Sequence, residues 1–169
     1  MRGDLHTLKR VCSYASVVML IGAIAFLILA IASVALGALS FTSDDIREMF
    51  TSLIKSGDSD LSLIAGTIEI AILFLAMSIT VKVIHDIMVS ITKEHSPFME
   101  ENANGFKLVS MTFLIISVPL AILEFLNRDD VILAIVIILG CILISVVMYC
   151  LTIIFRYGYL LQDESDHTL

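Results

Sequence analysis

The chain has 169 residues, of which 59% are apolar and 16% charged, and its mean hydropathy is +1.01. Soluble domains are usually about half apolar and about a quarter charged, so this composition excludes a soluble enzyme domain and a disordered chain. The net charge of −7 leaves no broad cationic surface for a phosphate backbone, which excludes direct binding of nucleic acid. The composition predicts an all-α, polytopic membrane protein.

Four apolar segments are each long enough to cross a bilayer, whose core of about 30 Å needs about 20 helical residues. The predicted spans are about 11–36, 61–89, 106–126 and 131–155. The first is far longer than the apolar region of a signal peptide, about 7 to 15 residues, and is predicted to be an uncleaved anchor. A tight turn at residues 127–130 makes the last two spans antiparallel neighbours. We expect a single membrane domain, an antiparallel four-helix transmembrane bundle.

The loop after the first span carries a helical pattern of its own. Apolar residues recur there at the spacing of one helical face, at Ile46, Met49, Phe50, Leu53 and Ile54. Asp44 and Asp45 suit the start of a helix, and Gly57 is predicted to stop it. We expect a short amphipathic outer helix that lies on the membrane surface or caps the bundle.

The loop after the second span is predicted to form a hairpin at about 90–105. Ser96 is the predicted N-cap of the next helix and Pro97 its first residue, with Glu100 and Glu101 in the opening turns. We therefore expect two helices to project beyond the membrane on this side.

The basic residues predict the orientation, because Lys and Arg are enriched on the cytoplasmic side. With the N-terminus inside, the inner segments hold Arg2, Lys9, Arg10, Lys82, Lys93, Lys107 and Arg156, and the outer segments hold Arg47, Lys55 and Arg128. This distribution predicts a multi-pass protein of the cell membrane with both termini, and therefore the tail 157–169, in the cytoplasm.

Small residues indicate which helix faces meet, since small side chains let helices approach closely in lipid. They recur at Ser16, Ala23, Ala30 and Gly37, at Ala65, Glu69, Ala76 and Thr80, at Ser110, Ser117 and Glu124, and at Ala134, Cys141, Ser145 and Thr152. These stripes predict a compact bundle with a mildly polar interior. Pro119 is expected to kink the third span or to leave a carbonyl free in it.

Two carboxyl groups lie within predicted spans. Glu69 lies about 12 Å along the second span, and Glu124 lies near the outer end of the third. An ionisable group at such a depth is costly and is a functional candidate by default, although a hydrogen-bonded Glu that only locks the helices together is the simpler alternative. Both acids lie in the outer half of the predicted bundle, where they could share one outward-facing polar pocket.

A second polar cluster lies at the inner end of the second span. Lys82 and Asp86 are i, i+4 neighbours that suit an ion pair, and His85 is a group that titrates near neutral pH. An interfacial anchor is the simpler interpretation of this cluster.

No catalytic motif, metal-binding spacing or cofactor motif is present, so we expect neither an enzyme nor a cofactor or metal. The three cysteines are Cys12, Cys141 and Cys150. All lie in or beside apolar segments, where a free cysteine usually acts as a small apolar residue.

Two inner segments resemble a known family. HSPFMEENANGFKLVS at 95–110 is similar to an element that precedes the third span in the domain of unknown function 2975 family, and FRYGYLLQDESDHTL at 155–169 is similar to that family's ending. The matching tail positions are Gly158, Leu161, Gln162, Glu164, Asp166, Thr168 and Leu169. Family members are small prokaryotic four-span membrane proteins without an established activity.

Genes of this family often neighbour one for a small helix-turn-helix regulator, so the resemblance implies a cytoplasmic protein partner. It marks as candidate contact residues Pro97, Phe98, Glu101, Asn102, Gln162, Glu164 and Asp166.

The first functional hypothesis is an interaction or regulatory membrane protein whose hairpin and tail bind a partner. One alternative is an oligomeric small transporter or channel component that uses Glu69 and Glu124, with a homo-oligomer as its assembly. The other is an immunity-type protein against a membrane-active peptide.

Overall fold

The computed structural model describes the backbone of residues 2–57, 59–93 and 98–167, and the side chains of residues 9–57, 59–93 and 98–165. Within these residues the chain is helical and has no strand. The helices are α1 (Arg2–Leu39), α2 (Asp44–Ile54), α3 (Asp60–Thr92), α4 (Glu100–Arg128) and α5 (Val131–His167). The all-α class is therefore confirmed.

Four of the helices, α1, α3, α4 and α5, are long and apolar enough to cross a membrane. The apolar stretches lie within Lys9–Leu39, Asp60–Thr92, Glu100–Arg128 and Val131–Ser165. This finding indicates a multi-pass membrane protein. Because about 20 residues suffice to span the hydrocarbon core, each helix is long enough to extend beyond it.

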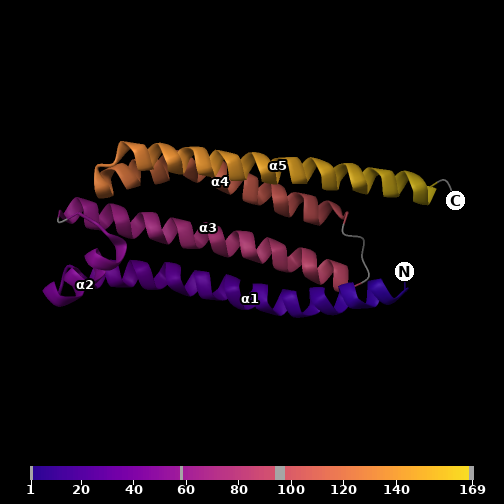
Figure 1. Ribbon diagram of the computed structural model, residues 1–169, viewed down its shortest axis with the longest axis horizontal. Coiled ribbons are helices and arrows are strands. Elements are labelled where there is room, and N and C mark those ends of the chain that lie inside the picture. The colour runs from indigo at the N-terminus through magenta and orange to yellow at the C-terminus, as the bar shows by residue number, and fades with distance from the viewer. Residues whose placement is uncertain (1, 58, 94–97, 168–169) are drawn as a thin grey trace.

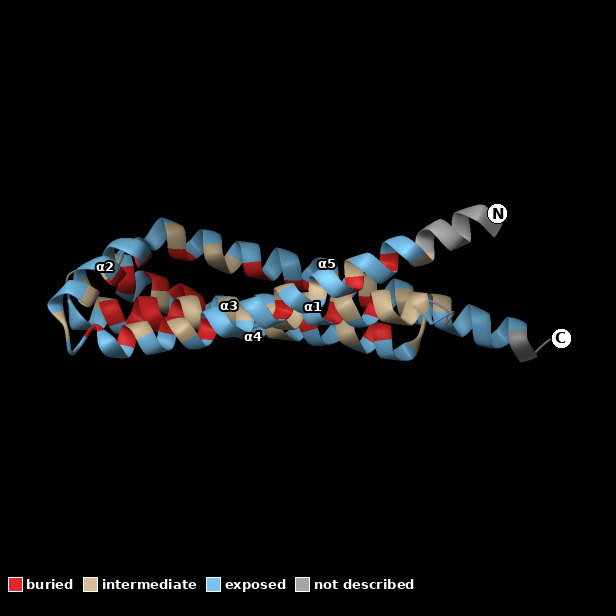
Figure 2. Ribbon diagram, turned by 90° about the horizontal axis from the view of Figure 1, so that it is seen from below, coloured by how far each residue is buried: buried red, intermediate tan, exposed pale blue. Residues whose placement is uncertain are grey.

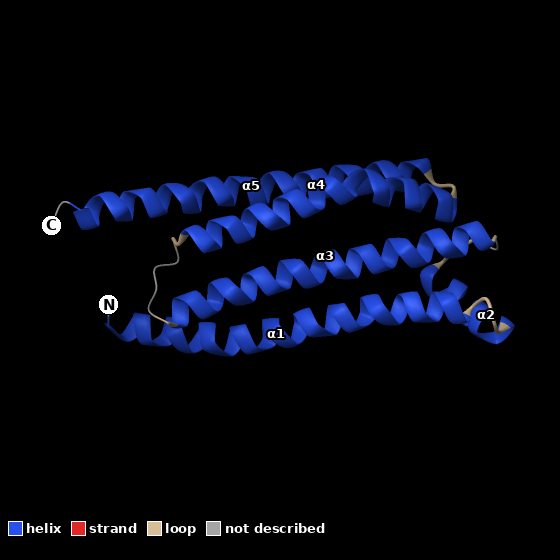
Figure 3. Cartoon of the chain, turned by 180° about the vertical axis from the view of Figure 1, so that it is seen from behind, coloured by secondary structure: helices blue, strands red, loops and turns tan. Residues whose placement is uncertain are grey.

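Successive long helices run in opposite directions, and both termini lie at the same end of the molecule (Figure 1; Figure 3). We call this the terminus end, and the opposite one, which holds α2 and the turn between α4 and α5, the α2 end. The helices pack in the order α1, α3, α4, α5, and among the described residues α1 makes no close backbone approach to α4 or α5. The arrangement is thus an open row of helices, less compact than the bundle expected from the sequence.

The small-residue stripes lie on the contact faces, as their spacing predicted. Buried positions include Ser16, Ala23, Ala30, Ala65, Ala76, Ser110, Ser117, Ala134, Cys141, Ser145 and Thr152. Figure 2 shows such buried positions along the inner faces of helices that are otherwise exposed. The stripe on α1 serves one neighbour, α3, and the stripe on α5 serves α4. Because α1 and α5 each have one face of small residues, each packs closely against one long helix, and both lie at the edges of the row. Pro119 lies inside α4 without ending the helix.

The short helix α2 caps one end of the row. Phe50 and Ile54 are buried against Leu63 of α3 and pack with Leu36 of α1. The other half of the predicted apolar face is exposed, since Leu53 is 75% accessible. Capping and contact with the membrane surface are therefore compatible, because each uses a different half of the face.

The predicted end of α2 at Gly57 is wrong. Lys55 takes the left-handed conformation, with φ of 52°, and its N–H group donates to the carbonyl of Thr51. The N–H group of Gly57 instead donates to the carbonyl of Asn127, at 3.3 Å, and so joins the α2 end to α4.

The predicted start of α4 is also wrong. Ser96 and Pro97 lie outside the described residues, and the helix begins at Glu100 with Met99 as N-cap. The ring of Phe98 packs against that of Phe155, with centroids 5.3 Å apart. This contact joins the connection between α3 and α4 to α5.

Candidate functional site

The two carboxyl groups of the predicted spans come together near the α2 end, between α3 and α4. Glu69 is 5% exposed and Glu124 is fully buried. The two carboxyl groups interact with each other, and Glu69 also interacts with the guanidinium group of Arg128. The structure therefore places in one cluster two acids that are 55 positions apart in the sequence (124 minus 69).

Two residues of α4 complete this cluster, which we call the carboxyl cluster: Glu69, Glu124, Asn127 and Arg128. The amide nitrogen Nδ2 of Asn127 donates to Oε2 of Glu69, at 3.2 Å. The guanidinium group of Arg128 donates to Oε1 of Glu124, at 3.0 Å, and to the carbonyl of Ile54 in α2, at 3.1 Å. The cluster thus connects α2, α3 and α4.

The carboxyl cluster contains two buried oxygen atoms without a hydrogen-bond donor among the described residues. They are Oε2 of Glu124 and Oδ1 of Asn127, and the latter residue is 3% exposed. The amide oxygen of Asn127 only accepts hydrogen bonds, and so does the carboxyl oxygen of Glu124 when that group is ionised. What both lack is therefore a proton donor or a cation.

Gly66 makes room for the cluster on α3. A Cβ atom at this position would lie 3.0 Å from both Oδ1 and Nδ2 of Asn127, and 3.0 Å from a side-chain carbon of Ile54. The absence of a side chain lets the Asn127 amide lie against the α3 backbone, one turn before Glu69.

A depression of about 380 Å³ opens at the α2 end beside the cluster. Asn127 and Arg128 line it together with residues of the α2–α3 connection, including Lys55 and Ser62. The cluster is therefore buried between the helices but adjoins a depression at the α2 end that has polar side chains in its lining.

The inner cluster stays together and also reaches α1. Lys82 forms an ion pair with Asp86, at 2.6 Å, and both side chains are about half exposed, at 53% and 54%. Nε2 of His85 lies 4.0 Å from Oδ1 of Asp86, and Nδ1 of the same ring lies 2.8 Å from the carbonyl of Ser16 in α1. Because a carbonyl only accepts, the ring nitrogen donates, and His85 joins α3 to α1.

The candidate contact residues fall into three groups. Glu101, Gln162 and Glu164 are exposed, as a contact surface requires. Asn102 is buried, at 4% exposure, and the half-buried Phe98 packs on Phe155. Pro97, Thr168 and Leu169 lie outside the described residues, as does the side chain of Asp166.

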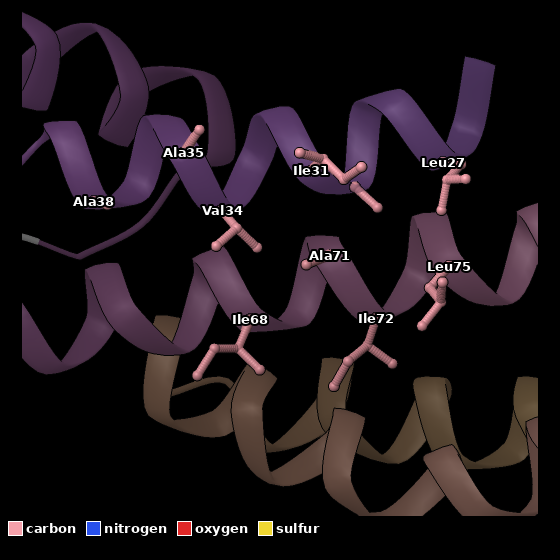
Figure 4. A pocket seen from close by; sticks show the side chains of 10 residues that line it. Leu27, Ile31, Val34, Ala35, Ala38, Ile68, Ala71, Ile72 and Leu75 are labelled. Carbon is pink, nitrogen blue, oxygen red and sulfur yellow. The ribbon is translucent and has the colours of Figure 1, made fainter. Parts of the chain in front are cut away.

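A further apolar groove of about 590 Å³ lies between α1 and α3 (Figure 4). Its lining consists of Leu, Ile, Val and Ala side chains, among them Leu27, Val34 and Ile72. Since it offers no polar group, the groove provides no path for an ion.

The described residues contain no group of three or more His, Cys, Asp or Glu side chains placed to hold a metal. Cys12 and Cys141 are buried free thiols, and Cys150 is an exposed one. No family model, curated protein or solved structure matches the chain. The resemblance to the domain of unknown function 2975 family therefore stays a prediction.

Sequence inspection missed Asn127, Arg128 and Gly66 as members of the site. The sequence pattern predicts both Asn127 and Arg128 in the turn at 127–130, where Arg128 indicates only the orientation of the chain. Two signals were available. Arg128 follows Glu124 at i+4, the spacing of a helical ion pair, and Gly66 precedes Glu69 by three residues on the same face.

Proposed function

We propose that the protein is an interaction protein of the cell membrane, whose terminus end lies in the cytoplasm and binds a basic protein partner. The observation that carries this proposal is the exposed end of α5. The helix has 37 residues and a length of about 55 Å, well above the bilayer core of about 30 Å. Tyr157, Leu160 and Leu161 in its last part are 64%, 52% and 50% exposed.

The charge of this surface selects the partner. Exposed Asp163 and Glu164 follow the apolar residues on the same helix, and Glu101 lies exposed at the start of α4. An apolar and acidic helical surface complements a basic surface with apolar residues. A DNA-binding regulator carries a basic surface by necessity, so binding here would compete with its binding to DNA.

Co-purification of this chain with the helix-turn-helix regulator implied by the family resemblance tests the proposal. The double variant Asp163→Lys/Glu164→Lys should lose the regulator, and wild-type binding should weaken as salt concentration rises. The matched control is Asp44→Lys/Asp45→Lys, the same charge change at exposed positions of the α2 end. If the regulator still binds both the tail variant and the chain without residues 157–169, the tail is not the binding surface.

The carboxyl cluster favours a second candidate, a transporter or channel component. Four helices in an open row do not enclose a pathway, so this function needs a homo-oligomer. Sodium or proton flux in reconstituted vesicles should then be lost in Glu69→Gln. An absence of flux in wild-type vesicles would count against this candidate and leave the interaction proposal untouched.

A further inference from the structure

We propose that Glu69, Glu124 and Asn127 bind a monovalent metal cation, with sodium as the fitting ion, which enters from the depression at the α2 end. This inference goes beyond the interaction function and does not depend on it. It rests on the buried oxygen atoms, the charge and the access of the carboxyl cluster.

The unpartnered atoms are the first argument. Oε2 of Glu124 and Oδ1 of Asn127 are buried acceptors, and both side chains neighbour the carboxyl group of Glu69. Turning the Asn127 amide over would not supply a donor, because it would place Oδ1 against the Glu69 carboxyl group and leave Nδ2 unpaired instead. Carboxylate and amide oxygens are the ligands that hard cations prefer.

The charge balance is the second argument. Two carboxylates face one guanidinium group, that of Arg128, so the ionised cluster carries one unbalanced negative charge. A buried charge is costly in a membrane segment unless it is paired. One monovalent cation balances the charge, whereas a divalent ion overshoots it and a water molecule does not change it.

A shared proton is the competing occupant. A proton between the two carboxyl groups also balances the charge. It satisfies a carboxyl oxygen, however, and leaves Oδ1 of Asn127 without a donor. A sodium ion bound by carboxyl and amide oxygens together would both balance the negative charge and provide a partner for the buried oxygen atoms.

Access is the third argument. Asn127 and Arg128 line the depression of about 380 Å³ and also belong to the carboxyl cluster. The depression therefore leads directly to one of the proposed ligands, Asn127. Lys55 and Asp129 at the rim carry opposite charges. A small hydrated ion can therefore reach the Asn127 amide without crossing the apolar face of α3.

The test is thermal unfolding of the full chain in dodecyl maltoside at constant ionic strength, with sodium replacing N-methylglucamine. We expect the midpoint to rise with sodium and to saturate, because a ligand that binds only the folded state stabilises it. Glu124→Gln and Asn127→Ala should lose this rise, while Glu48→Gln, an exposed acid of α2, should keep it.

Direct binding of radioactive sodium to the wild-type chain keeps the proposal testable if the variants do not fold. One saturable site per chain is expected. No saturable binding, an equal midpoint shift with every salt, or a sodium shift that persists in both ligand variants would overturn the proposal. Stabilisation by acid but not by sodium would overturn it in favour of a shared proton.

Discussion

At the scale of single residues, the α2 end depends on one glycine and one amide. Gly66 lets the Asn127 side chain lie against α3, and Asn127 holds Glu69 by its Nδ2 group. A methyl group on residue 66 would meet three side-chain atoms at 3.0 Å. Such a distance is shorter than ordinary contact, so either the amide or Ile54 must move.

Gly66→Ala should therefore lower the free energy of unfolding by about 1 to 2 kcal/mol, the usual cost of overpacking. Gly140→Ala in α5 is the matched control, because a Cβ atom there meets nothing within 4 Å. It should be neutral or stabilising by about 0.5 to 1 kcal/mol, since alanine leaves the unfolded chain fewer conformations to lose on folding than glycine does. Thermal unfolding in detergent measures both, and equal shifts would refute the close approach.

Arg128 is the partner that makes a fully buried Glu124 tolerable. Arg128→Met should destabilise the protein by about 2 kcal/mol, because it leaves a buried acceptor without its donor. Adding Glu124→Gln should recover part of this loss, since the amide carries no charge. A double-mutant cycle measures the coupling, and purely additive effects would contradict the ion pair.

The candidate site could be predicted from the sequence only in part. Glu69 and Glu124 are conspicuous because each interrupts an apolar segment. Asn127 gives no such signal, since a polar residue near a helix end usually faces water. Its burial results from the approach of α2 and α3, which is a tertiary effect that local sequence does not record.

At the scale of elements, one half of the apolar face of α2 is buried and the other half is exposed. Phe50 is 2% exposed and packs on α1 and α3, whereas Leu53 is 75% exposed. Arg47 of α2 also pairs with Asp60 at the start of α3. These contacts make α2 a cap held by one half of its apolar face.

Phe50→Ala should consequently cost about 3 kcal/mol, as truncation of a buried aromatic side chain does. Leu53→Ala should change stability by less than about 0.5 kcal/mol, as substitutions at exposed positions do. Chemical or thermal unfolding in detergent distinguishes them. A larger loss for Leu53 would mean that α2 is held by its outer half instead.

The presence of the long helices could be predicted from the sequence, but the exact residues at which α2 ends and α4 begins could not. Long uncharged segments predict spans well, because a helix satisfies all of its backbone hydrogen bonds within a single segment in lipid. The ends differ from the prediction: Lys55 rather than Gly57 closes α2, and α4 begins at Glu100, two residues after Phe98, whose ring packs on Phe155. The cap at Lys55 is local but places a non-glycine residue in the left-handed conformation, and the contact of Phe98 with Phe155 is tertiary.

At the scale of the whole molecule, the row of antiparallel helices brings both ends of the chain to the same end of the molecule, which predicts that both termini lie on one side of the bilayer. In a cysteine-free background, Ser52→Cys in α2 and Gln162→Cys in α5 give exposed labels at opposite ends. A membrane-impermeant maleimide should label the first in intact cells and the second only after permeabilisation. Labelling of Gln162→Cys in intact cells would reverse the orientation and move the proposed partner surface outside.

The row also divides the chain into two halves that are each joined internally. Ser78 donates to the carbonyl of Ala23, at 2.8 Å, and thereby links α3 to α1. Ser110 and Ser145 share a hydrogen bond of 3.1 Å between α4 and α5. During synthesis the first half can thus enter the bilayer and complete its own contacts before the second half leaves the ribosome. We therefore expect the chain to insert as two pairs of helices, α1 with α3 and α4 with α5, and the contact between α3 and α4 to form last.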